Sequence, residues 1–509
     1  MNAEQKQLEA IHNFEGKYPK QIWSLFFSEM WERFCFYGMR GMLVFFMIDQ
    51  LKLAEGQSQL QYAAIQAFVY AFTFVGGLFA DKILGFRKSL FWGGTLMIVG
   101  SILLSINPHN LFFVGIAFTV VGTGFFKPNI STMVGELYRK GDPRTDAGFS
   151  LFYAGINIGA FIGGYVCIAI GKGHLFSDVI EASQRWNVAF SLAAFVMLIS
   201  LINFYFTKKS LGPIGLQPNQ ISASGEVSKM PIWKEISVYV ASILAIPLIM
   251  AMVQNTDYTD YFMFTIGPLT LVYLFYEMTK VSVEDRKKLI AALVFIFFSI
   301  LFWGIYEQAG GSLTIFAANN LNSELFGVHL DPNGVNNSGG ALFIILLAPI
   351  FGALWIWLAK KKLNPNTVIK FGLGFIFLGL GYYVLFGTRF FADAAGITSL
   401  DFFTLALLVI TFGELCLSPI GLSIMTKLST QNLQGMMMGM WFLASAYGQY
   451  VAGIIGSNMS DSVVEGGSNL DKLLAYTNGY KEIALYSIIA GLFLIIISPL
   501  VRKLMQDVK

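Results

Sequence analysis

The sequence predicts an all-α integral membrane protein with 14 transmembrane helices, and two observations on composition and patterning support this prediction. Hydrophobic residues make up 55% of the 509 residues and charged residues only 13%. Soluble domains carry about 25% charged residues, because a folded surface exposed to water needs polar cover. The apolar residues also gather in long runs. This composition excludes a soluble enzyme, a disordered chain and a coiled coil.

The apolar runs reach the length of about 20 residues that a helix needs to cross roughly 30 Å of hydrocarbon. The residues before the first run are polar, so we expect no cleavable signal peptide. The predicted spans are 21–51, 60–80, 89–106, 110–134, 147–171, 186–207, 232–253, 258–279, 289–320, 340–359, 367–388, 399–427, 434–458 and 478–501.

The distribution of basic residues predicts the orientation of the chain. If the N-terminus is cytoplasmic, the inner segments hold 25 of the 34 Lys and Arg residues and the outer segments hold six. Cytoplasmic loops carry such an excess. We therefore expect both termini in the cytoplasm. The net charge of only +3 gives no reason to expect a nucleic-acid partner.

The order of the spans predicts the domain organisation. Six spans precede the long inner segment 208–231, two follow it, and six more complete the chain. We expect an N-terminal six-helix bundle over 1–207, a linker with an inserted, peripheral two-helix hairpin over 208–286, and a C-terminal six-helix bundle over 287–509. Two six-helix halves are the layout of major-facilitator transporters.

Charged residues inside the first span indicate a functional face. Glu29, Glu32, Arg33, Tyr37 and Arg40 fall on one face of roughly 140° at helical spacing. A charge at the bilayer centre costs about 2.5–3.5 kcal/mol on insertion scales. This face is therefore expected to line an aqueous interior or to contact another helix.

Three further charges lie deep in other spans, at Lys127, Glu307 and Glu414. They could be fixed ion pairs that orient helices, but buried ion pairs stabilise little. A pathway for substrate and protons is the favoured interpretation. Arg and Lys bind a carboxylate, whereas a buried carboxylate binds an ammonium group or exchanges a proton. Such an interior suits a zwitterionic ligand.

Other kinds of chemistry find little support in the sequence. The three cysteines and four histidines are scattered, so we expect no metal site, no cofactor and no catalytic residues. A membrane enzyme would need a catalytic constellation that includes a histidine in a span. A channel and a non-transporting sensor remain alternatives, and uphill accumulation of a solute would exclude a channel.

Seven motifs resemble the proton-dependent oligopeptide transporter (POT, or peptide transporter) family of the major facilitator superfamily, in family order and over almost the whole chain. They are EMWERF (29–34), GGLFADKILGFRK (76–88), GTGFFKPN (122–129), FSLFYAGINIG (149–159), FWGIYEQAGGSL (302–313), GELCLSPIGLS (413–423) and MMMGMWFL (436–443). The resemblance implies secondary active symport of di- and tripeptides with protons across the bacterial inner membrane. It also implies that the inserted hairpin is a common feature of bacterial members.

The resemblance also implies roles for individual residues. Lys127 would pair with the glutamates of the first span, and Glu307 would face Arg40 as an outer gate. Asn157 would contact the peptide backbone and Glu414 the peptide amino terminus. The proton-coupling and gating set is Glu29, Glu32, Arg33, Arg40, Lys127 and Glu307. The substrate-binding set is Tyr37, Arg40, Tyr70, Lys127, Asn157, Trp303, Glu414, Ser418 and Trp441.

Structural alternatives stay open for several of these residues. Asn157 could make an interhelical hydrogen bond, Tyr37 and Tyr70 could be packing aromatics, and Trp303 could anchor an interface. Ser418 precedes a proline and could mark a hinge or a static kink. Gly155, Gly159 and Gly163 are expected to form a close-packing face.

One departure from the family pattern concerns the tenth span. Family members often read Asn-Pro shortly before an APxF motif, whereas this chain has Gly340 and Ala341 there. The asparagine usually helps to bind the peptide amino group, and Asn336 or Asn337 could compensate for its loss. The departure supports an alternative substrate on the same fold: nitrate, an amino acid or a peptide-like metabolite. We expect a monomer, because two halves already enclose one site.

Overall fold

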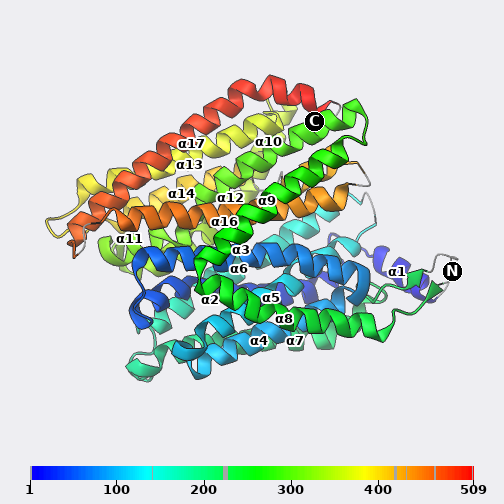
Figure 1. Ribbon diagram of the computed structural model, residues 1–509, viewed down its shortest axis with the longest axis horizontal. Helices are drawn as coiled ribbons and strands as arrows, with labels where there is room; N and C mark the ends of the chain where they lie inside the picture. Colours follow the sequence, from blue (N-terminus) through cyan, green and yellow to red (C-terminus); the bar gives the residue numbers. More distant parts are fainter. Residues whose placement is uncertain are drawn as a thin grey trace. The chain divides into compact units, whose positions relative to one another are not determined.

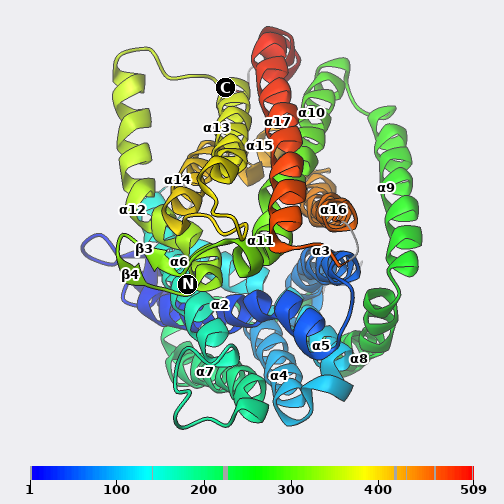
Figure 2. The same cartoon turned by 90° about the vertical axis from the view of Figure 1, so that its left-hand side faces the viewer.

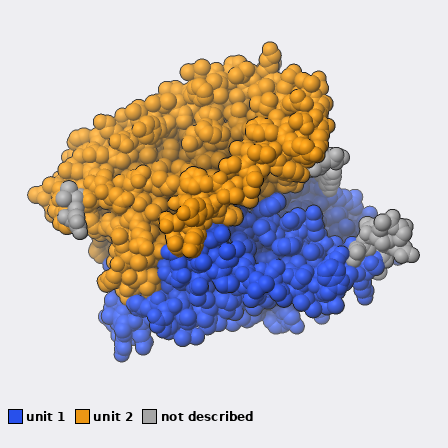
Figure 3. Space-filling view, viewed as in Figure 1, with its two compact units in different colours: residues 1–43, 68–254 blue, residues 44–67, 255–509 orange. Residues whose placement is uncertain are grey.

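The structure, a computed structural model, describes residues 3–139, 142–221, 227–417, 421–430, 433–463, 466–506 and 508. Its helices divide into two units, which Figure 3 distinguishes by colour. Unit 1 comprises residues 1–43 and 68–254, and unit 2 comprises residues 44–67 and 255–509. The helix α3 (Glu55–Phe79) therefore contributes one part to each unit.

Unit 1 is a helical bundle in which α4 packs along α5 and α7. Figures 1 and 2 show these helices side by side. Unit 1 includes its part of α3 and the residues up to Leu43 of α2 (Ile22–Phe45). It also contains α1 (Ala3–His12), η2 (Ala80–Leu84), α4 (Phe86–Ile106), α5 (Pro108–Glu136), α6 (Thr145–Gly171), η3 (Ala182–Gln184), α7 (Arg185–Thr207), η4 (Lys208–Leu211), β1 (Gln220–Ile221), β2 (Val227–Ser228) and α8 (Ile232–Gln254). The two short strands pair antiparallel.

Unit 2 is a second bundle, in which α13 packs along both α14 and α17 while α10 packs on α16 (Figures 1 and 2). It contains η1 (Phe46–Gln50), α9 (Thr256–Met278), α10 (Val283–Tyr306), η5 (Glu307–Gly310), α11 (Ser312–Asn320), β3 (Glu324–Leu325), β4 (Val328–His329), α12 (Pro332–Lys360), α13 (Thr367–Gly387), η6 (Thr388–Phe391), α14 (Leu400–Leu417), α15 (Gly421–Leu428), α16 (Gln434–Asp461) and α17 (Asn469–Met505).

Eleven helical stretches of the described residues are long and apolar enough to cross a membrane. They overlap eleven of the predicted spans, although residues 418–420 of the span predicted at 399–427 lie outside the described residues. The other three predictions, 21–51, 258–279 and 434–458, also form long helices, namely α2, α9 and α16 with 24, 23 and 28 residues. α2 carries the charged residues discussed above. The protein is thus a multi-pass membrane protein, and the count of 14 crossings stays a prediction.

The surface of the spans is apolar, as a bilayer requires. On α12, for example, Leu346, Ile350 and Ile356 are all exposed. In water such a surface would be a liability, but lipid tails cover it without cost. The exposed apolar side chains therefore agree with the composition of the chain.

The two helices of the predicted hairpin belong to different units. In unit 1, Glu235 of α8 accepts hydrogen bonds from Lys88 Nζ at 2.6 Å and from the Tyr239 hydroxyl at 2.9 Å. In unit 2, the Tyr450 hydroxyl of α16 donates to Asp260 Oδ1 of α9 at 2.7 Å. Each helix is therefore fastened to its own unit by a polar contact.

Candidate functional site

A buried ion cluster lies on α2 in unit 1. Arg33 Nε is 3.2 Å from Glu29 Oε1, and the guanidinium also donates to both carboxylate oxygens of Glu32, with Nη2 2.5 Å from Oε1. The three residues are at most 1% exposed. The planar guanidinium of Arg33 thus faces two carboxylates, an arrangement that suits its several N–H donors. Among the described residues, Glu29 Oε2 has no hydrogen-bond partner.

The position of α2 is fixed by close contact with α6. A Cβ atom on Gly159 would lie 2.1 Å from the Met30 carbonyl oxygen, and one on Gly163 would lie 2.3 Å from the Phe34 carbonyl oxygen. Only glycine fits where two backbones approach this closely. The predicted close-packing face of α6 is therefore confirmed, and it holds the backbone beside Arg33.

Lys127 of α5 lies beside this cluster. Its Nζ is 4.7 Å from the centroid of the Tyr70 ring, a cation–π contact between α5 and α3. It also lies within electrostatic range of Glu29, Glu32 and the two arginines of α2. The direct ion pairs of the glutamates are with Arg33, whereas Lys127 faces an aromatic ring in this conformation. Lys127 and Tyr70 are thus brought together with the α2 cluster.

The remaining candidates of unit 1 lie on α2 and α6. Arg40 Cζ is 5.7 Å from the Tyr37 ring centroid, and both side chains are half-buried. Asn157 is 5% exposed and its Nδ2 donates to the Tyr153 carbonyl at 2.9 Å. That hydrogen bond lies within α6, not between helices as the packing alternative supposes.

The candidates of unit 2 meet around Tyr306. The Tyr306 hydroxyl of α10 donates to Glu414 Oε2 of α14, and Glu414 is 8% exposed. The Tyr306 ring stands edge-on to Trp303 with centroids 5.3 Å apart and stacks on Phe302 at 5.8 Å. Trp303 and Glu414, which are 111 residues apart in the sequence, thus share one tyrosine.

Glu307 lies where the predicted span 289–320 is interrupted. α10 ends at Tyr306, η5 runs from Glu307 to Gly310, and α11 begins at Ser312. Glu307 is 5% exposed and lies within electrostatic range of Glu414. Discontinuous helices are common at the binding sites of transporters. Because Arg40 belongs to unit 1 and Glu307 to unit 2, their contact as an outer gate stays a prediction.

The groups released by this interruption are hydrogen-bonded inside unit 2, as a membrane interior demands. Asn336 Nδ2 donates to the Ala309 carbonyl at 2.8 Å. Gln308 Nε2 donates to the Ala452 carbonyl at 3.0 Å, and Gln308 Oε1 accepts from the Ser312 hydroxyl at 2.7 Å. These side chains hold the end of α10 in place beside Glu307.

The structure says less about two candidate residues, Trp441 and Ser418. Trp441 of α16 is 7% exposed, on a helix that packs against α10. Ser418 lies outside the described residues. The roles of both as substrate-binding residues stay predictions.

The departure at Gly340 leaves open space. A Cβ atom on Gly340 would meet no heavy atom within 4 Å. Asn336 and Asn337, the proposed substitutes, both use their amide nitrogens in structural hydrogen bonds, Asn336 to Ala309 and Asn337 to the Asn333 carbonyl at 3.0 Å. The compensation that we considered from the sequence therefore competes with contacts that these amides already make.

The sequence analysis missed residues that position the candidates. Tyr306 holds Glu414, and the Tyr382 hydroxyl donates to the Ile305 carbonyl at 2.7 Å beside the end of α10. The spacing of Tyr306, three residues after Trp303, is a signal that could have placed it on the same helix face. In the part of the chain that the structure describes, no group of three His, Cys, Asp or Glu residues could hold a metal ion.

The model of the POT family matches residues 87–470 of this chain. A peptide transporter of Yersinia enterocolitica, YePEPT, is 32% identical over 96% of this chain and 96% of its own length. A di-/tripeptide transporter of Lactococcus lactis subsp. cremoris is also 32% identical, over 96% of this chain and 97% of its own length. These similarities extend across both units.

Solved structures with the same fold include a mutant of the peptide transporter POT in complex with alafosfalin. It is 30% identical, covers 100% of both chains and superposes with a TM-score of 0.81. A tetrameric PepTSo2 structure is 25% identical, covers 95% of this chain and 98% of its own, and also has a TM-score of 0.81. A POT family transporter in complex with 5-aminolevulinic acid is 27% identical, covers 97% and 99% of the two chains, and has a TM-score of 0.80.

Proposed function

The chain belongs to the POT family, and from this premise we propose that it is a proton-coupled symporter that imports di- and tripeptides by alternating access. The buried ion cluster of Glu29, Glu32 and Arg33, with Lys127 beside it, is the observation that carries the proposal. A purely structural role would not explain these charges, because a charge inside a bilayer is costly and buried ion pairs contribute little stability. The named substrates of its relatives support peptides as the cargo.

A peptide is a zwitterion, and the two units offer complementary groups for its ends. Arg40 and Lys127 are cations for the carboxylate, and Glu414 is the anion for the ammonium group. Tyr306 fixes Glu414 through its hydroxyl. Asn157 contacts the peptide backbone, while Tyr37, Tyr70, Trp303, Ser418 and Trp441 contribute the remaining contacts.

Proton coupling acts through the α2 cluster. A proton that binds Glu29 or Glu32 neutralises one of the two carboxylates that contact Arg33. The electrostatic attraction between that carboxylate and Lys127 is then lost. Glu29 Oε2 is buried and lacks a donor among the described residues, so a proton there would relieve the cost of burial. Release of proton and peptide inside the cell lets Lys127 re-pair with the glutamates. Arg40 and Glu307 close the outer side.

The proton gradient is the energy source, and the transporter uses no cofactor. The chain resides in the bacterial inner membrane with both termini in the cytoplasm, an orientation supported by the excess of Lys and Arg in the inner segments. We propose a monomer as the functional unit, although a related structure is described as tetrameric. Light scattering of the purified protein tests this: a mass of one chain supports the monomer and a larger mass excludes it.

Peptide counterflow tests the substrate assignment apart from proton coupling. Liposomes loaded with unlabelled dialanine should take up labelled dialanine without any proton gradient. We expect Glu414→Gln to weaken dialanine binding at least about 30-fold, because removing one member of a buried charge pair costs ~2–5 kcal/mol. The matched control is Glu277→Gln, a carboxylate paired with Lys280 at the end of α9. Equal counterflow in all three proteins would contradict the role of Glu414.

A second candidate is a peptide-like metabolite, and the open space at Gly340 favours it. A related transporter has been solved with 5-aminolevulinic acid, which supports this alternative. Competition distinguishes the two. Unlabelled compounds are added outside as competitors of labelled dialanine. If unlabelled dialanine inhibits its counterflow more strongly than 5-aminolevulinic acid, alanine or nitrate, peptides are the cargo. The reverse order would assign the site to the stronger competitor.

A further inference from the structure

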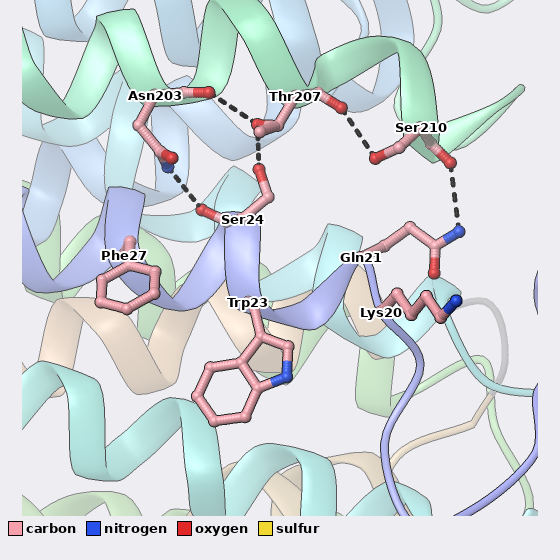
Figure 4. Close-up of a pocket in the computed structure, with 8 residues that line it drawn as sticks. All are labelled: Lys20, Gln21, Trp23, Ser24, Phe27, Asn203, Thr207 and Ser210. Carbon is pink, nitrogen blue, oxygen red and sulfur yellow. Dashed lines mark hydrogen bonds between the residues drawn. The ribbon is translucent and has the colours of Figure 1, made fainter.

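A pocket opens in unit 1 where α2 begins and α7 ends, and its lining includes none of the candidate site residues. Its volume is about 420 Å³, and Figure 4 shows the residues that line it. Trp23 and Phe27 come from α2 and Lys20 from the segment before it, whereas Thr207 and Ser210 come from the end of α7 and η4. The pocket thus lies at helix ends, where a bilayer meets water.

The polar side of this pocket is already hydrogen-bonded. Asn203 Nδ2 donates to the Ser24 carbonyl at 2.9 Å, the hydroxyls of Ser24 and Thr207 bond to each other, and the Ser210 hydroxyl donates to the Thr207 carbonyl at 2.8 Å. Gln21 Nε2 donates to the Ser210 carbonyl at 3.3 Å. The bonds of Ser24 join α2 to α7, and the bond of Gln21 joins the segment before α2 to η4 (Figure 4). They leave few donors to surround a free inorganic anion.

The apolar side is formed by aromatic rings that are open to the surroundings. Trp23 is 45% exposed and Phe27 is 42% exposed, with ring centroids 6.4 Å apart. In Figure 4 both rings project from α2 away from α7. Tryptophan at a helix end is typical of the membrane interface, where its ring sits at the level of the headgroups. The rings therefore offer a surface for acyl chains or the glycerol backbone.

The charge at the pocket is positive. Lys20 is exposed, and no acidic residue is among those that line the pocket. Lys208, which lies between the lining residues Thr207 and Ser210, directs its Nζ to the rings of Phe91 and Tyr205, 4.8 and 4.2 Å from their centroids, so Lys20 is the lysine among the lining residues. Basic residues at this end of the helices belong to the segments that the Lys and Arg distribution places in the cytoplasm. Anionic lipids are enriched in that leaflet and attract juxtamembrane Lys.

We propose that this pocket binds one anionic phospholipid of the cytoplasmic leaflet, with its phosphate at Lys20 and its apolar part against Trp23 and Phe27. A free phosphate fits less well, because the hydrogen-bond donors of the polar side are already used within the protein. It would also leave the rings of Trp23 and Phe27 exposed. The lipid would cover the junction of α2 and α7. The inference depends on the membrane location of the chain, not on its cargo.

Native mass spectrometry of the purified protein with phosphatidylglycerol or phosphatidylcholine tests the proposal. We expect tighter binding of phosphatidylglycerol, and an approximately fivefold loss of that affinity in Lys20→Gln with unchanged phosphatidylcholine binding. The matched control is Lys234→Gln, which removes a lysine beside the exposed Trp233 but lies outside the pocket. It should behave as the wild type. Trp23→Leu should weaken both lipids.

Four results would overturn the proposal. Equal affinity of Lys20→Gln and the wild type for phosphatidylglycerol would remove the assigned cation. Equal losses in Lys20→Gln and Lys234→Gln would indicate non-specific surface charge. Displacement of the lipid by millimolar inorganic phosphate would indicate a simple anion site. A lipid-free dimer that the Trp23→Leu variant dissociates would assign the pocket to a second copy of the chain.

Discussion

At the scale of single residues, the decisive feature is one guanidinium shared by two buried carboxylates. Arg33 contacts Glu29 and Glu32, and all three are almost completely buried. The sequence alone identified these residues, because charge is rare and expensive inside a span. The spacing of Tyr306 after Trp303 offers a helix face, but it does not reveal that Tyr306 pairs with Glu414, which lies 108 residues away.

Removing Arg33 should therefore cost stability as well as transport. Arg33→Gln leaves two buried carboxylates without their cation, and we expect a loss of about 3–5 kcal/mol in the free energy of unfolding. Thermal unfolding in detergent measures this. Arg502→Gln, at an exposed position near the C-terminus, is the control and should change little. The double variant Arg33→Gln/Glu32→Gln should recover much of the stability. Failure to recover would show that charge is not the cause.

A second residue-scale prediction concerns pH in the loop before α6, outside the spans. Hydrogen bonds from Arg144, with Nη2 2.7 Å from Asp142 Oδ2, lower the pKa of Asp142 to about 2. Because the folded pKa is depressed, this contact stabilises the loop above the ordinary pKa of about 3.9. That stabilisation is lost as the pH falls through about 2. At neutral pH it is fully present.

Carbon NMR of the Asp142 carboxyl group checks this shift. The signal should titrate near pH 2 in the wild type and near the ordinary value of about 3.9 in Arg144→Gln. The same titration in both proteins would show that Arg144 does not set the pKa.

At the scale of elements, the length of the apolar runs predicted where the long helices lie. The span predicted at 367–388, for instance, is α13 (Thr367–Gly387). The interruption of 289–320 at η5 was not predicted, because the run is apolar on both sides of it. Its stability depends on distant partners such as Asn336 and the Ala452 carbonyl, which a local pattern does not contain.

This interruption gives a prediction with a close control. Asn336→Ala leaves the Ala309 carbonyl without that donor in a buried environment, so we expect a loss of about 1–3 kcal/mol in the free energy of unfolding. Asn337→Ala removes an amide whose hydrogen bond, among the residues that the structure describes, lies within α12, and its effect should be smaller. Thermal unfolding of both variants measures the difference. An equal or reversed order would contradict the assigned role of Asn336.

At the scale of the whole molecule, the sequence predicts two six-helix bundles with limits at 207 and 287, and these limits stay a prediction. The contacts between helices group residues 44–67 with unit 2 and α8 with unit 1. Linker composition marks where the chain leaves the membrane, whereas the units are defined by which helices pack together. α3 is one continuous helix, so no local signal marks its division.

The free energy of proton entry sets how far the transporter can accumulate peptide. A membrane potential of 100 mV supplies about 2.3 kcal/mol for each proton that enters. One proton per peptide therefore supports roughly 50-fold accumulation, and a pH gradient adds to it. A channel on the same scaffold would only equilibrate the two sides.

Uptake of labelled dialanine into liposomes under an inward proton gradient tests proton-coupled peptide transport most directly. The wild type should accumulate dialanine above its external concentration, and an uncoupler should abolish the excess. Glu32→Gln should retain counterflow but lose this accumulation, because its side chain cannot exchange a proton. Uptake that stops at equal concentrations, or accumulation that neither the uncoupler nor Glu32→Gln affects, would contradict proton-coupled peptide transport by this protein.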